Sequence, residues 1–224
     1  VACVCGIDED RVLERVAEFG GTGYTDHVEM LEEGGLDWVH VGTPVQTHYD
    51  LAMDAIDRGV DVLVEKPITE TYEQYEELQA AAADAGVRLT EVHTALYHPE
   101  VRWLRERVEA GAVGEVRSVE AYFGEDLRPD SLFRGDWVLD LPGGELEEGF
   151  AHPLYCALRL GGYPTDAEDV SISRVLKGEY DQDFAYDGVA VSYPTERDAL
   201  TTVHVQSNVP TQKSLRVHGE DGTL

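Results

Sequence analysis

Positive charge is scarce in this sequence, and lysine is nearly absent. The 224 residues include 17 Lys and Arg against 45 Asp and Glu, a formal net charge of -28, and the lysines are Lys66, Lys177 and Lys213. A protein that binds nucleic acid by neutralising phosphates needs a basic surface, so that class is excluded. Dense carboxylates stay hydrated where salt screens charge over roughly 3 Å at about 1 M. The composition therefore favours a folded protein with an acidic shell in a salt-rich cytoplasm, as in a halophile.

Cysteine and long apolar runs are also scarce. Cys3, Cys5 and Cys156 are too few for a disulfide framework, and the Cys3-x-Cys5 spacing fits neither a zinc ribbon nor a redox pair. No window reaches the ~18 to 20 apolar residues of a membrane span, and no charged-then-apolar leader opens the sequence. Acidity alone would suit a disordered chain, but 42% hydrophobic residues with repeated periodicity indicate a core. We expect a soluble cytoplasmic protein with no membrane contact.

The first part of the chain alternates short apolar runs with helical periodicity, which is typical of βαβ units and a parallel sheet. Strands are expected at residues 1–5, 37–42, 60–64 and 88–93. Helices are expected after Asp8, after Thr47, and after Thr71, where Gln74 completes a capping box. The residues expected to face the core are Val12, Leu13, Val16, Phe19, Leu51, Ala52, Ala55, Ile56, Tyr72, Tyr75, Leu78 and Ala82.

The pattern becomes rich in β-strands from Val116 onward. A helix starting at Pro99 precedes this change. The expected strands are residues 116–123, 170–176, 189–193, 200–206 and 214–218, with one helix over roughly 147–160. This order predicts an α+β domain with a mainly antiparallel sheet. We therefore expect two domains, residues 1–95 and 96–224.

Two features concern the ends of the sequence and a glycine-rich segment. The sequence begins inside an expected strand and stops just after a turn-like segment at 219–221, so we interpret it as part of a longer chain. Gly20-Gly21-Thr22-Gly23 follows a helix, whereas glycine loops that bind phosphate open a helix after a strand. We interpret this segment as a helix stop with a turn.

Two polar clusters follow expected parallel strands, at the sheet edge where doubly wound folds bind ligands. The first comprises Thr43, Pro44 and His48, and the second is Glu65-Lys66-Pro67. Each has a simpler interpretation: the threonines could cap the next helix, and Lys66 could be an ion-paired or snorkelling side chain.

A third cluster places Glu148, His152 and Tyr155 at i, i+4 and i+7, on one face of an expected helix that follows Gly143-Gly144. A carboxylate one turn before a histidine can hold its tautomer, and histidine suits proton transfer near neutral pH. Plain surface pairing is the alternative. The cluster has no third nitrogen or thiolate at a usable spacing, so no metal site is predicted, and no serine or cysteine triad signature is present.

The order of these three clusters resembles the glucose-fructose oxidoreductase, inositol dehydrogenase and rhizopine-catabolism (Gfo/Idh/MocA) family. The segment 55–60 leading into Glu65-Lys66-Pro67 and the segment 99–116 are also similar to that family. The resemblance implies a Rossmann-type, doubly wound dinucleotide-binding domain over 1–95 that lacks its first strand and glycine loop. It also implies that 96–224 is a C-terminally truncated domain for substrate binding and oligomerisation.

The resemblance further implies an NAD(P)-dependent oxidoreductase, a homodimer or homotetramer, that acts on a hydroxyl-bearing carbon of a sugar, polyol or derivative. Lys66 and His152 would be catalytic, with His152 as the acid/base. The substrate would contact Glu148, Tyr155 and Tyr97. The cofactor would contact Ile7, Asp8, Thr43, Pro44, His48, Glu65 and Lys66.

Several positions depart from the family pattern. Gly6 stands where an acidic residue often binds the ribose of NAD, so NAD and NADP both stay open, with Asp8 and Arg11 nearby. Leu96 replaces a frequent arginine, and Glu148 replaces an aspartate. Alternatives to a dehydrogenase are an NAD-dependent glycosidase of the same family and a non-catalytic cofactor-binding sensor or scaffold. The presence of Lys66 and His152 counts against the sensor.

Overall fold

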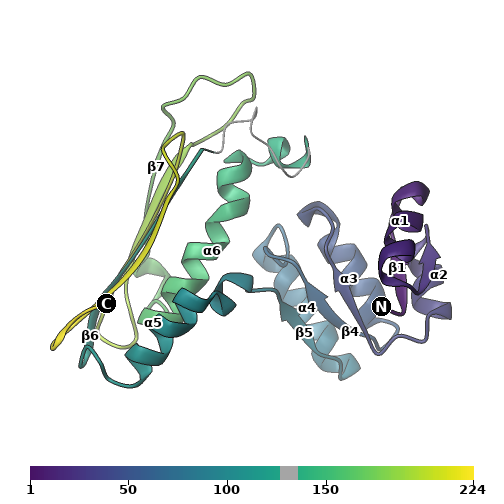
Figure 1. Cartoon of the computed structure of the whole chain (residues 1–224), viewed down its shortest axis with the longest axis horizontal. Helices are drawn as coiled ribbons and strands as arrows, with labels where there is room; N and C mark the ends of the chain where they lie inside the picture. The colour runs from purple at the N-terminus through teal and green to yellow at the C-terminus, as the bar shows by residue number, and fades with distance from the viewer. Residues whose placement is uncertain (127–135) are drawn as a thin grey trace. The chain divides into compact units, whose positions relative to one another are not determined.

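The computed structural model describes residues 1–126 and 136–224, and the chain divides into two compact units, Val1–Val92 and His93–Leu224 (Figure 1). The sequence pattern placed the boundary three residues later, at 95/96. In the described residues, no helix combines the length and the apolar character that a membrane crossing requires.

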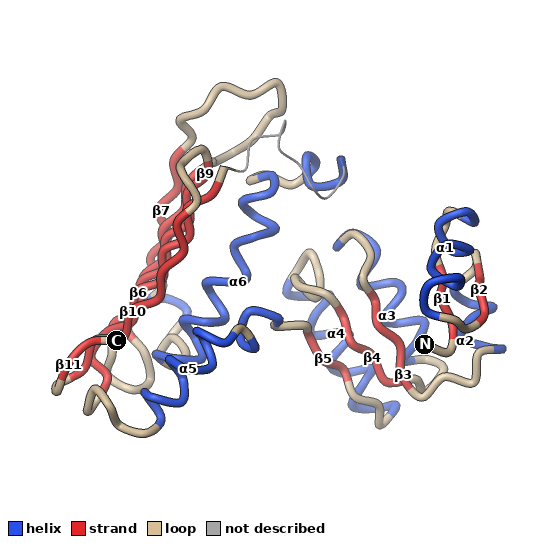
Figure 2. Tube along the Cα trace, in the orientation of Figure 1, coloured by secondary structure: helices blue, strands red, loops and turns tan. Residues whose placement is uncertain are grey.

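The first unit contains only parallel strand pairs. Strand β1 (Cys3–Cys5) pairs with β2 (Thr22–Tyr24), and β3 (Trp38–Val41), β4 (Asp61–Val64) and β5 (Leu89–Glu91) form a second sheet in that order (Figure 2). Helices α1 (Glu9–Phe19), α2 (His27–Glu33), α3 (His48–Ile56) and α4 (Tyr72–Ala85) connect the strands. The predicted βαβ organisation is confirmed, whereas β2 and α2 were not predicted.

Local capping explains where the helices of this unit begin. The Asp8 side chain accepts a hydrogen bond from the Arg11 amide at the start of α1. Thr71 and Gln74 form both bonds of the predicted capping box at the start of α4, and Gly86 ends that helix with φ 69°. These side chains satisfy amides that a helix cannot pair internally, so the sequence alone locates these ends.

Several predictions of which helical side chains are buried were wrong. Val12, Ala52, Ala55, Ile56, Leu78 and Ala82 are buried as predicted. Leu13 is 57% exposed, Phe19 54% and Tyr72 67%. In α1 the reason is that the helix packs mainly against β1 and β2, which cover one side of it.

Close packing explains one of the early glycines. Gly21 adopts φ 98°, and a Cβ atom there would lie 2.6 Å from the carbonyl oxygen of Ala2. Its chain neighbour Thr22 donates from its amide to that same oxygen as β2 joins β1. Gly20 caps α1 as expected, but the turn leads directly into a strand.

The second unit is a six-stranded sheet with helices on one side (Figure 1). Its strands are β6 (Val116–Glu125), β7 (Ser171–Val175), β8 (Gly188–Pro194), β9 (Leu200–Ser207), β10 (Gln212–Gly219) and β11 (Gly222–Thr223), in the order β11-β10-β6-β9-β8-β7. All neighbours are antiparallel except β6 and β9. The predicted mainly antiparallel α+β unit is confirmed.

The core of this unit lies between the sheet and its helices. Helices α5 (Pro99–Glu109) and α6 (Gly144–Gly161) are the long ones, and α6 packs on β6 and β9. Short 3-10 segments occur at Thr94–Tyr97, Asp136–Asp140 and Ala167–Asp169. The residues buried between the layers include Val119, Ala121, Leu146, Ala157, Leu160, Val191, Val203 and Val217. This layering turns one face of α6 toward the sheet.

Candidate active site

In the first unit, two loops at the carboxyl ends of β3 and β4 are tied together through His48. Its Nδ1 lies 2.8 Å from the carbonyl oxygen of Pro67, and its Nε2 lies 2.8 Å from that of Thr43. The ring is 1% exposed. His48 therefore holds the segment after β3 against the segment after β4. The prediction that its ring contacts a cofactor stays untested.

Lys66 is buried, with 8% of its surface exposed, directly after β4. The peptide bond between Lys66 and Pro67 is cis. Next to it, Glu65 lies 3.4 Å from Nε2 of His40, and the Ile68 amide donates to Glu91 Oε1 over 3.0 Å. Polar contacts thus surround the segment that follows β4, and Lys66 lies at the carboxyl end of this parallel strand.

The Thr43–Thr47 turn is not a simple helix cap. A 3-10 turn, Val45–Thr47, precedes α3, and Thr47 makes no side-chain capping bond to that helix. Its hydroxyl instead lies 2.8 Å from the carbonyl oxygen of Pro44 and 2.7 Å from Oγ1 of Thr43. The capping alternative is therefore wrong for Thr47, and the turn is closed on itself.

The other predicted cofactor residues of this unit lie after β1. Ile7 is fully exposed, and Asp8 caps α1. Arg11 Nε lies 3.6 Å from Asp8 Oδ2, so the arginine and the carboxylate lie together at this helix start.

In the second unit, α6 carries the predicted Glu148, His152 and Tyr155. The Tyr155 hydroxyl accepts a hydrogen bond from the Ala95 amide over 2.9 Å and lies 2.7 Å from Nδ1 of His152. The ring of His93 stacks on Tyr155 with centroids 4.3 Å apart. Tyr155 is 7% exposed. A buried phenol therefore orients the histidine from one side.

The two glycines before this cluster allow α6 to start against aromatic rings. Gly144 has φ 58°, and a Cβ atom on it would lie 2.9 Å from Phe184 Cζ. A Cβ atom on Gly143 would lie 2.5 Å from the ring of Tyr186. Glu147 accepts hydrogen bonds from the Gly143 amide and the Tyr186 hydroxyl. Burial, together with this bond to Glu147, raises the pKa of Tyr186.

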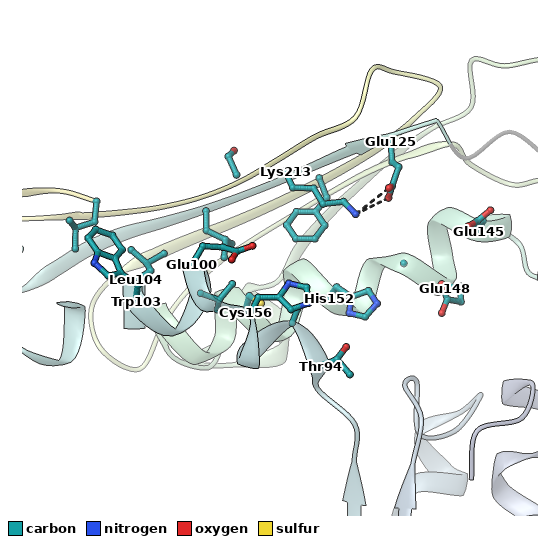
Figure 3. Close-up of a pocket in the computed structure, with 18 residues that line it drawn as sticks. Thr94, Glu100, Trp103, Leu104, Glu125, Glu145, Glu148, His152, Cys156 and Lys213 are labelled. Carbon is teal, nitrogen blue, oxygen red and sulfur yellow. Dashed lines mark hydrogen bonds and ion pairs between the residues drawn. The ribbon is translucent and has the colours of Figure 1, made fainter. Parts of the chain in front are cut away.

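A cavity of about 620 Å³ lies between α5, α6 and the sheet of the second unit, and Glu148 and His152 line it (Figure 3). This is within the range of ligand sites, roughly 300–1,000 Å³. Tyr155 lies behind His152 and is not one of the lining residues, and Tyr97 is 75% exposed. Their predicted contacts with a substrate stay predictions.

Sequence reasoning missed four charged residues that line this cavity. They are Glu100 on α5, Glu125 at the end of β6, Glu145 on α6 and Lys213 on β10. The scarcity of lysine, which drew attention to Lys66, applies equally to Lys213. Its position beside Glu125 depends on strand pairing that the sequence does not reveal.

Comparison with known families matches each unit to a family model. Residues 1–93 match a model described as an oxidoreductase family with an NAD-binding Rossmann fold. Residues 101–224 match the GFO/IDH/MocA C-terminal domain.

Characterised relatives are longer than this chain. It is 31% identical over 192 residues to dTDP-3,4-didehydro-2,6-dideoxy-alpha-D-glucose 3-reductase of Actinomadura kijaniata, covering 86% of this chain and 55% of that protein. It is 29% identical over 233 residues to D-xylose 1-dehydrogenase (NADP(+)) 2 of Haloferax volcanii, covering 100% and 66%. The chain thus spans about half to two thirds of the length of these relatives.

Solved structures with the same fold include a probable dehydrogenase from Thermotoga maritima, with a TM-score of 0.86 at 19% identity, covering 100% of this chain and 67% of that one. GenD2 from gentamicin A biosynthesis in complex with NAD has a TM-score of 0.84 at 24% identity, covering 100% and 63%. At these identities the likeness concerns the fold.

Proposed function

The chain belongs to the Gfo/Idh/MocA oxidoreductase family, and from this premise we propose that the intact protein is an NAD(P)-dependent dehydrogenase or reductase. It transfers a hydride between nicotinamide and a hydroxyl-bearing carbon of a sugar, a polyol or a derivative. The observation that carries this proposal is the pair of His152, lining a ligand-sized cavity, and the Tyr155 hydroxyl, 2.7 Å from its Nδ1.

The first unit fits a dinucleotide, because doubly wound sheets bind such ligands at the carboxyl ends of their parallel strands. The loops there hold Thr43, Pro44, Glu65 and the buried Lys66. Ile7 and Asp8 follow β1 and would contact the adenosine half. When bound, the nicotinamide supplies or accepts the hydride.

The residues of the chain would manage the proton and the orientation of the substrate. His152 takes the hydroxyl proton during oxidation and returns it during reduction, a role that suits an imidazole near neutral pH. Glu148, 5% exposed and lining the cavity, can accept a hydrogen bond from a second hydroxyl. Lys66 can donate to the reacting oxygen and stabilise negative charge that develops there.

A spectrophotometric assay of the intact protein tests this function. NADH and NADPH absorbance is followed while polyols, aldoses and their oxidised forms are offered. Absence of turnover with intact cofactor binding would favour a sensor or scaffold. Release of an aglycone without net cofactor reduction would favour the family's glycosidase chemistry.

Two variants test the proposed catalytic roles. Lys66→Ala and His152→Ala should each lower the rate of the chemical step by roughly 10² or more while cofactor binding is largely kept. Lys177→Ala, at an exposed lysine, is the control and should keep full activity. Near-normal turnover in either test variant would refute the role assigned to that residue.

We further propose that the intact protein has another strand between β1 and β3. Among the described residues β1 pairs only with β2, and β3 only with β4, which leaves an edge of each available. A strand there would carry the glycine loop that residues 1–224 lack. NADH fluorescence titration should show much tighter binding to the intact protein than to residues 1–224, and equal binding would contradict this proposal.

We also propose a cytoplasmic homo-oligomer, a dimer or tetramer assembled through the sheet face of the second unit opposite α6. Glu120, Tyr122, His204 and Arg216 lie on that face by strand alternation. Light scattering of the intact protein measures the state directly, and a monomer at micromolar concentration would contradict the assembly.

A further inference from the structure

The cavity of the second unit is lined by unequal numbers of charges. Among the described residues that line it, the acidic ones are four glutamates, and Lys213 is the one lysine, with no arginine. Formal negative charges therefore exceed positive charges by three when histidine is neutral. The glutamates are Glu100, Glu125, Glu145 and Glu148.

Burial makes part of this negative charge effective toward a ligand. Glu148 is 5% exposed, so water and salt screen its carboxylate poorly. An anion placed in the cavity would be repelled by this group, whereas a neutral hydroxyl could donate a hydrogen bond to it. An ammonium group would gain a charge-assisted hydrogen bond.

The single lysine of the cavity is held by a carboxylate. Lys213 Nζ lies 3.2 Å from Glu125 Oε1 and 3.1 Å from Oε2, and it lies 5.6 Å from the centre of the Phe123 ring (Figure 3). Lys213 therefore does not present an isolated positive charge to a ligand.

Strand register places this pair on the face of the sheet that α6 covers. Lys213 is opposite Phe123 in the pairing of β10 with β6, and Glu125 lies two residues further along β6, so all three side chains share one face. The same strands carry a similar pair on the other face, where Glu120 is opposite Arg216 and their charged atoms lie 3.9 Å apart. The second pair provides a matched control.

We propose that the Glu125–Lys213 ion pair sets the charge specificity of this cavity, so that it binds neutral or amino-bearing polyhydroxyl compounds and rejects those with a phosphate or carboxylate. This proposal rests on the proposed function in taking the cavity as the substrate site. Glu125 acts in two ways, because it contributes negative charge and holds the one cation that could bind an anion.

Binding measurements on the intact protein with its cofactor test the selectivity without requiring turnover. The probes are D-glucose, D-glucosamine, D-glucuronate and D-glucose 6-phosphate, together with myo-inositol and its monophosphate, titrated by calorimetry. The neutral and amino compounds should bind at least about tenfold more tightly than their anionic counterparts. Tighter binding of the anionic members, or no binding by any member, would overturn the proposal.

Variants then test the ion pair itself. Glu125→Gln should strengthen binding of the phosphate and carboxylate probes about five- to tenfold and leave the neutral probes nearly unchanged, since both side chains of the pair are partly exposed. Adding Lys213→Met should abolish that gain. Glu120→Gln makes the same charge change on the other sheet face and should have no effect on selectivity.

The outcomes separate this proposal from the proposed function. Unchanged selectivity in Glu125→Gln, or an equal change in Glu120→Gln, would overturn the role of the pair even if the protein is an active dehydrogenase. Selective binding that shifts in Glu125→Gln, without turnover of any compound, would instead contradict the proposed function and support the charge specificity.

Discussion

Tyr155→Phe removes one oxygen atom that connects the candidate acid/base to the backbone. The Ala95 amide donates to this oxygen over 2.9 Å, and His152 Nδ1 lies 2.7 Å from it. The phenol oxygen has two acceptor lone pairs, so besides the Ala95 amide it can accept from Nδ1–H of His152, which leaves Nε2 of the neutral imidazole unprotonated and able to take the substrate proton. We therefore expect Tyr155 to select the tautomer of His152.

The stability cost of this substitution follows from burial. Ala95 is 6% exposed, and a buried amide without its acceptor costs about 1–3 kcal/mol. The ring of Tyr155, and its stacking on His93, are kept, so no cavity forms. We expect the free energy of unfolding to fall by this amount and Tm to fall by several degrees.

The kinetic effect distinguishes positioning from a structural role. With the tautomer no longer selected, kcat should fall about tenfold, and the pH profile of kcat should shift while KM changes little. Tyr122→Phe removes a hydroxyl from the other sheet face and is the matched control. A variant with lowered Tm but unchanged kcat and pH profile would refute the assignment.

Three further predictions concern stability and thiol chemistry. Hydrogen bonds from the backbone amide and the side chain of Arg88 lower the pKa of Asp61 in the folded protein below its usual 3.8. The stability that ionised Asp61 contributes is therefore complete above the pKa of the unfolded chain and is lost as the pH falls through the lower pKa of the folded protein. Asp61→Asn should therefore weaken the acid-side pH dependence of stability, measured by circular dichroism, and an unchanged curve would contradict this. Burial raises the pKa of Cys156 to about 12, so alkylation of the native protein at about pH 8 should label it last among the cysteines by mass spectrometry. Gly144→Ala should lower stability by about 1–3 kcal/mol in denaturant titrations because of its positive φ and its contact with Phe184, and an unchanged midpoint would show that the helix start relaxes freely.

The starts of α1 and α4 and the type of each domain could be predicted from the sequence because they depend on near neighbours. Asp8 and the Thr71/Gln74 capping box satisfy amides within three residues. The pattern changes near Val116 from alternating strands and helices to mostly strands. This change predicted a parallel sheet in the first domain and a mainly antiparallel sheet in the second. The resemblance to the oxidoreductase family likewise came from short clusters that keep their order along the chain.

Burial of individual side chains depended on contacts that the sequence does not specify. Phe19 and Tyr72 have the correct helical spacing, yet they are exposed. Periodicity indicates that a helix has an apolar face, but only the packed neighbours decide how much of that face is covered.

The candidate site likewise combines features that the sequence predicts with features that only the tertiary structure determines. Chemistry-bearing types at strand ends and on one helix indicated Lys66, His48 and His152. Only the tertiary structure decided that His48 joins two backbone carbonyls, that Tyr155 orients His152 from behind, and that Lys213 is held by Glu125. Residue type and local spacing determine which helices form and which chemistry is available. Partners 19, 60 or 88 positions apart are set by strand pairing and layer packing, which no short segment encodes alone.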